Sequence, residues 1–392
     1  MGKITHDLLP KQRSRKHNLK VEIDIYPYAT ELYEELEHIG IINRVKEIPQ
    51  LGVIKVAKRL AKTRYDYVML QLYLHQMIKN HLQGHLRLTY NNYVAAKEFR
   101  KDYKYIKKDK PSIGDILQLL TIVYNIGHFY NTFTASRAVT MLASEDSAFF
   151  DMVVGASTSE RFHEAAKSIL NSKNYQRLHL LNSILILERC DQAKQSVSLA
   201  MEILYAYINE STLPEDSKLK YAFAIFRNVR TVSYMAYDLQ IAETPLTIDL
   251  CNEKAMILLL QELLSEYNNN QSSHHLVQST TKLLDDTVYN ENSNAICYYK
   301  ISRKMVSLIT KDPSYTSTNY YADLFADKSS ILNRTHAHKR DYAQSQILKL
   351  TFSGDQRFLS EALLADLEKI NNTRVGYYDR RFLAYFPLAL HF

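Results

Sequence analysis

The sequence predicts an all-α protein, a compact helical bundle that continues into a C-terminal helical lobe. Its 392 residues include only 9 Gly and 8 Pro, too few turn-forming residues for an all-β sandwich or barrel. Hydrophobic side chains make up 46% of the chain, enough for a substantial core. The glycines are spaced too widely to form a dinucleotide-binding or phosphate-binding glycine loop.

Apolar residues recur with helical spacing along much of the chain, and several stretches are almost fully apolar. The longest of these are rich in Leu, Ala and Met, so we expect them to form central helices. The predicted helical segments are 32–39, 51–57, 162–170, 178–187, 197–208 and 255–264. Breaks in the pattern are predicted at 110–112, 211–216, 268–275, 311–313 and 371–372.

None of these breaks is long enough to be a flexible linker between domains, and no repeat of about 30 to 45 residues is visible. The sequence therefore does not mark a sharp domain boundary. We expect a core of residues 1–275 and a C-terminal helical lobe of residues 276–392 that packs on the core.

Cysteine use and apolar run length indicate the compartment. Cys190, Cys251 and Cys297 lie far apart without a paired spacing, which is typical of a reducing environment. The apolar runs fall short of the ~20 residues that a membrane span requires, and no targeting signal is visible. We expect a cytoplasmic protein with no membrane partner.

The net charge of +7 is concentrated locally. In residues 97–110, Lys and Arg side chains alternate with aromatic ones, a composition that can bind phosphates or nucleic acid. The same segment contains three acids that dilute its positive field, which favours a solvated connector between helices over a binding surface. Nucleic acid remains a candidate partner for this segment.

Three short segments together suggest a site. Residues 62–67 (KTRYDY) open a helix, residues 119–129 (LLTIVYNIGHF) form an apolar helix that runs into a polar turn, and residues 226–238 (FRNVRTVSYMAYD) form a third helix. Their order resembles the HD-domain deoxynucleoside triphosphohydrolases, all-α enzymes with the motifs T-R-x-x-H, L-L-H-D-[IL]-G-H and D-x-D-[KR]-x-x-Y-x-x-R-D. At the level of motifs the resemblance covers about half of the chain.

In that family, His and Asp side chains at four of these positions hold divalent metal. Here the four positions are Tyr67, Tyr124, Asn125 and Arg230. None is His or Asp, and an arginine cation repels a metal ion. We therefore expect no tightly bound transition metal, and any Mg²⁺ would arrive with the nucleotide.

The resemblance also implies residues that hold the nucleotide. Arg64 matches an arginine that contacts the phosphates, a task suited to a forked guanidinium. His128 matches a histidine beside the scissile phosphate. Tyr234 matches a tyrosine that packs on the deoxyribose, and Asp238 an acid that accepts from its 3′-hydroxyl. These side chains remain although all four metal positions have changed, as in a repurposed nucleotide site.

The resemblance thus implies a protein that binds deoxynucleoside triphosphates, either as a divergent triphosphohydrolase or as an inactive sensor. In an enzyme, His128 would handle the proton, Tyr124 and Asn125 would form a non-standard dyad, and Arg64 and Arg230 would offset oxyanion charge. A homo-oligomer and a role in antiviral nucleotide depletion follow from the same analogy. The alternative is a catalytically inactive helical interaction protein that binds nucleic acid or a protein partner through its basic faces.

Overall fold

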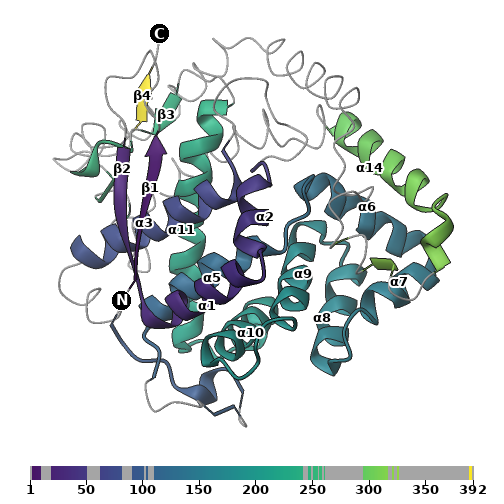
Figure 1. The fold of residues 1–392 in the computed structure, drawn as a ribbon, viewed down its shortest axis with the longest axis horizontal. Coiled ribbons are helices and arrows are strands. Elements are labelled where there is room, and N and C mark those ends of the chain that lie inside the picture. Colours follow the sequence, from purple (N-terminus) through teal and green to yellow (C-terminus); the bar gives the residue numbers. More distant parts are fainter. Residues whose placement is uncertain are drawn as a thin grey trace.

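The computed structural model describes residues 2–9, 19–50, 62–81, 91–100, 103–104, 110–241, 246–248, 250–254, 256–257, 260, 295–316, 320–321, 325 and 388–390. Helices dominate these residues, with eleven α-helices and two small two-stranded sheets (Figure 1). The prediction of a mainly helical protein is confirmed.

An antiparallel hairpin precedes the first helix, where the sequence analysis predicted no strand. β1 (Gly2–Leu9) pairs with β2 (Leu19–Ile25), with Gly2 opposite Ile25. In β2 the side chains of Val21, Ile23 and Ile25 are buried and alternate with less buried charged ones. This alternation is the period of a half-buried strand.

The predicted helices agree with the structure wherever it describes them. Residues 162–170, 178–187 and 197–208 lie in three consecutive helices, and 32–39 overlaps the first helix of the chain. Residues 51–57 and most of 255–264 lie outside the described residues. The helices are α1 (Pro27–His38), α2 (Ile41–Glu47), α3 (Arg64–His81), α5 (Ile113–Ile126), α6 (Thr132–Glu145), α7 (Ser147–Val154), α8 (Glu160–Asn171), α9 (Leu178–Leu187), α10 (Gln195–Ile208), α11 (Lys218–Ile241) and α14 (Ala295–Ile309).

The predicted breaks at 110–112, 211–216 and 311–313 also fall between helices. Those at 268–275 and 371–372 lie outside the described residues. Short 3-10 helices occupy several connections. They are η2 (Ala96–Glu98), η3 (Tyr175–Arg177), η4 (Glu210–Thr212) and η7 (Pro313–Thr316).

Helix α5 is the centre of the fold. All its side chains except that of Asp115 are buried, since α1, α3, α9, α10 and α11 pack around it (Figure 1). A helix that is apolar on every side can only be stable in such an environment. Its position brings residues from distant segments against its C-terminal half.

Described parts of residues 276–392 pack on the core. Helix α14 contacts α6, where the Ser302 hydroxyl donates to the backbone oxygen of Thr134 at 2.9 Å. The Tyr321 hydroxyl donates to Asn182 Oδ1 at 2.6 Å. Strand β4 (Leu388–Leu390) pairs with β3 (Leu246–Ile248), which follows α11. Among the described helices, none combines the length and apolarity needed to cross a membrane.

Candidate functional site

Three of the four residues that the resemblance placed at metal-ligand positions meet in the structure. The Tyr67 hydroxyl of α3 donates to the backbone oxygen of Arg230 on α11 at 2.9 Å. The Arg230 guanidinium lies over the Tyr124 ring of α5, 4.9 Å from its centroid. A cation over a tyrosine face is an attractive contact, so α3, α5 and α11 are joined at this point.

Asn125, the fourth residue, is engaged elsewhere. It is fully buried, and its Nδ2 donates to the backbone oxygen of Thr121 one turn earlier at 2.9 Å. Its Oδ1 has no hydrogen-bond partner in the part of the chain that the structure describes. Because neighbouring helix residues point in directions about 100° apart, Tyr124 can face α11 while Asn125 does not share that contact.

His128 lies just beyond the end of α5 and is fully buried. Its ring stacks on that of His179, with 4.1 Å between centroids and 7° between planes. Burial lowers the pKa of His128 well below its usual range, and the positive charges of Arg64 and Arg230 contribute to this effect. The imidazole is therefore neutral at physiological pH.

Arg64 opens α3 and is 5% exposed, with its guanidinium 5.9 Å from the Tyr67 ring centroid and 5.6 Å from that of Phe133. Arg44 donates to the backbone oxygens of Ile126 and His128. Such contacts satisfy carbonyl groups that the end of a helix leaves unpaired. Arginines therefore gather around the C-terminal end of α5.

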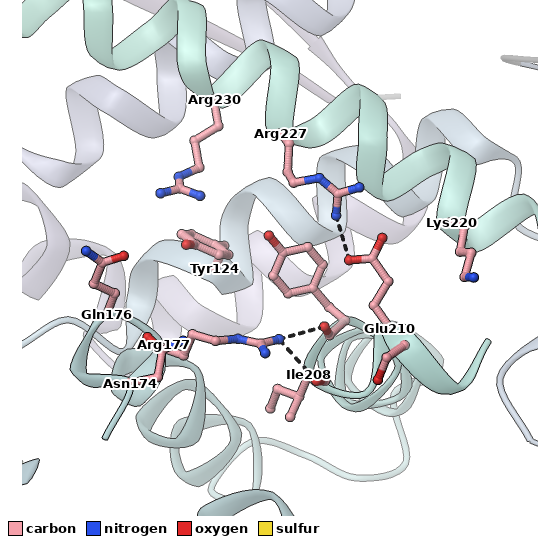
Figure 2. Close-up of a pocket in the computed structure, with 11 residues that line it drawn as sticks. Tyr124, Asn174, Gln176, Arg177, Ile208, Glu210, Lys220, Arg227 and Arg230 are labelled. Atoms are coloured by element: carbon pink, nitrogen blue, oxygen red, sulfur yellow. Dashed lines mark hydrogen bonds and ion pairs between the residues drawn. The ribbon is translucent and has the colours of Figure 1, made fainter. Parts of the chain in front are cut away.

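A pocket of about 600 Å³ opens beside Tyr124 and Arg230 (Figure 2). Among the described residues that line it, four side chains are cations and one is an acid, so this part of the wall carries an excess of positive charge. The lining residues are Tyr124, Asn174, Gln176, Arg177, Tyr207, Ile208, Glu210, Ser211, Lys220, Arg227 and Arg230.

Arg177 and Arg230 have no carboxylate partner among the described residues. Arg177 Nη2 instead donates to the backbone oxygens of Tyr207 and Ile208, at the end of α10, at 2.9 and 3.1 Å. Burial raises the pKa of Tyr207 to about 12, so its hydroxyl stays protonated and able to donate. We call Tyr124, Arg177 and Arg230 the arginine end of the pocket.

The opposite part of the pocket, which we call the ion-pair end, contains Glu210, Lys220 and Arg227. Arg227 Nη1 donates to Glu210 Oε2 at 2.5 Å, and Lys220 pairs with Glu215 at 2.6 Å. Each cation at this end thus has a carboxylate partner. The sequence held a signal for this wall, since Lys220, Arg227 and Arg230 recur on α11 at spacings that share one helix face.

Of the two predicted sugar-binding residues, Tyr234 is not among those that line the pocket. Tyr234 is half-buried and packs against the core, and the side chain of Asp238 lies outside the described part of the structure. Arg64, Tyr67 and His128 are also absent from the wall. Of the predicted site residues whose side chains the structure describes, the pocket contains Tyr124 and Arg230.

Residues 97–110 are described only in part. The Phe99 ring packs edge-on against Tyr103, and Tyr103 is 7% exposed. Arg100 lies 3.6 Å from the buried carboxylate of Glu202. Tyr103 is thus buried and Phe99 packs against the core while partly exposed, so the Tyr103 ring is not available for stacking with a nucleic acid base.

No group of three or more His, Cys, Asp or Glu side chains is placed to hold a metal ion within the described ranges. Scans of protein-family models, curated protein sequences and solved structures found no match to this chain.

Proposed function

We propose that this protein binds a deoxynucleoside triphosphate, with the phosphates at the arginine end of the pocket. The observation that carries the proposal is the pair of arginines, Arg177 and Arg230, that meet Tyr124 and Tyr207 in one cavity without a carboxylate partner among the described residues. Removing a cation from water without a counter-ion is unfavourable in free energy, and a bound anion offsets this desolvation penalty.

The chemistry of the wall suits a phosphorylated aromatic ligand. Guanidinium groups form paired hydrogen bonds with phosphate oxygens, while tyrosine rings offer apolar area and a hydroxyl donor for a base or sugar. Tyr67 has a supporting role, because its hydrogen bond to the backbone oxygen of Arg230 fixes α11 at this turn. The resemblance supplies the choice of a deoxynucleotide within this ligand class.

The geometry favours a sensor over a triphosphohydrolase. A general acid or base must come within hydrogen-bond reach of the reacting group, whereas His128 is fully buried against His179 and lies off the pocket wall. Tyr124 faces Arg230 without Asn125 beside it. Assembly as a homo-oligomer and a role in antiviral nucleotide depletion stay predictions of the family analogy.

The test is calorimetric titration of dNTPs and NTPs into wild type and Arg230→Met, with analysis for released triphosphate. Loss of a charged hydrogen-bond donor costs about 1.5–3 kcal/mol, so dNTP binding should weaken at least tenfold in the variant. The ligand-free variant should have a stability close to that of wild type, because the loss of the attractive contact with Tyr124 is offset by removal of a cation without a carboxylate partner among the described residues.

Arg189→Met is the matched control, since Arg189 is exposed and lies outside the pocket. It should leave dNTP affinity unchanged. Equal nucleotide affinity in wild type and Arg230→Met would refute the proposed site. Release of triphosphate would show that the protein is an enzyme and not a sensor.

A further inference from the structure

The two ends of the pocket differ in charge. At the arginine end, Arg177 and Arg230 have no carboxylate partner in the described residues. At the ion-pair end, Arg227 is paired with Glu210 and Lys220 with Glu215. A ligand that matches this pattern is anionic at one end and neutral at the other, since a second phosphate at the ion-pair end would meet a carboxylate.

Glu210 is the acid of the pocket wall. It begins η4, two residues after the end of α10, and its side chain is 25% exposed. Arg227 binds Oε2 at 2.5 Å, and within the described residues no second group is hydrogen-bonded to the carboxylate. One carboxylate oxygen is thus oriented by Arg227 and the other retains its acceptor capacity (Figure 2).

We propose that Glu210 selects the neutral end of the ligand by accepting a hydrogen bond from a hydroxyl or amino group of the nucleoside. This inference depends on the proposed function, because it assumes that the phosphates occupy the arginine end. Arg227 is the positioning residue, since it fixes the carboxylate through an ion pair. A carboxylate in a pocket accepts from a donor and repels an anion, so it orients a ligand with one charged end.

The experiment compares two probes, inorganic triphosphate and each of the four dNTPs, in wild type, Glu210→Gln and Glu210→Asp. Inorganic triphosphate has the charged end alone. In Glu210→Gln the dissociation constant of the preferred dNTP should rise about tenfold or more, while that of triphosphate should stay unchanged or fall. Glu210→Asp retains the charge but withdraws the acceptor by one methylene, so it should also weaken dNTP binding and spare triphosphate.

Glu164→Gln is the control, because Glu164 is an exposed acid of α8 that does not line the pocket. Neither probe should respond to it. Equal shifts for both probes in Glu210→Gln, or a Glu210→Asp variant with wild-type dNTP affinity, would overturn the inference and leave the proposed function standing. A wild type that binds neither probe would overturn both.

Discussion

Gly127 shows how a single residue lets two helices approach at the candidate site. A Cβ atom here would lie 2.0 Å from the backbone oxygen of His179 and 2.4 Å from the backbone nitrogen of Ser183. Both atoms belong to α9, whose Asn182 side chain donates to the backbone oxygen of Gly127 at 3.0 Å. The end of α5 therefore contacts the backbone of α9, and this brings His128 against His179.

We expect Gly127→Ala to destabilise the fold by about 3 kcal/mol or more, because two backbone segments would have to separate. Urea unfolding followed by circular dichroism measures the change. The matched control is Gly155→Ala, where the added Cβ would meet the backbone oxygen of Asp151 at 3.1 Å and a small shift suffices. Equal stabilities for the two variants would show that α5 and α9 are farther apart than described.

At the scale of elements, α5 depends on its N-terminal cap as well as on burial. The Ser112 hydroxyl accepts from the backbone nitrogen of Asp115 at 3.2 Å. In return the Asp115 carboxylate accepts from the backbone nitrogen of Ser112 at 2.9 Å and from its hydroxyl at 2.6 Å. This capping box satisfies amide groups that the first turn leaves unpaired.

Ser112→Ala should lower the free energy of unfolding by about 1 kcal/mol, the usual cost of losing an N-cap. Nucleotide affinity should not change, because Tyr124 lies three turns away at the other end of the helix. Urea unfolding and dNTP titration of the same variant check both statements. Ser144→Ala provides the comparison, since that hydroxyl donates to a backbone oxygen in the last turn of α6 and caps no helix start. A loss of affinity in Ser112→Ala would mean that the cap shapes the pocket.

At the scale of the whole molecule, buried imidazoles connect stability to pH. His75, His128 and His179 are fully buried, and burial lowers the pKa of each, that of His75 to about 3. In the unfolded chain a histidine has a pKa near 6.5. Below that pH the unfolded state takes up protons that the folded state does not, so stability falls as the pH falls.

We therefore expect the free energy of unfolding to decrease as the pH falls below about 6, with a contribution from His75 of about 1.4 kcal/mol per pH unit between about pH 6 and pH 4 and contributions of the same sign from His128 and His179. Urea unfolding at pH 7, 6, 5 and 4 gives the slope. In His75→Gln the slope should be smaller by the contribution of that one imidazole. A slope that His75→Gln does not alter would mean that His75 is protonated in the folded protein.

The sequence by itself determined the helical class, because helix formation depends on local spacing of apolar residues and on local breaks. The sequence also predicted that Tyr67, Tyr124 and Arg230 belong to one site. In the structure, Tyr67 and Tyr124 each contact Arg230. It missed the hairpin, although the alternation in residues 19–25 was visible.

Only the tertiary structure decided which side chains form the pocket wall. Arg177 and Glu210 stand in short 3-10 helices with no motif around them, and they meet Arg230 because α9, α10 and α11 all pack on α5. Likewise, Tyr124 and Asn125 are neighbours in the chain, but only Tyr124 contacts Arg230, because α11 packs against one side of α5. A contact between distant segments depends on how whole helices pack, and this information is not present in any local pattern of residues.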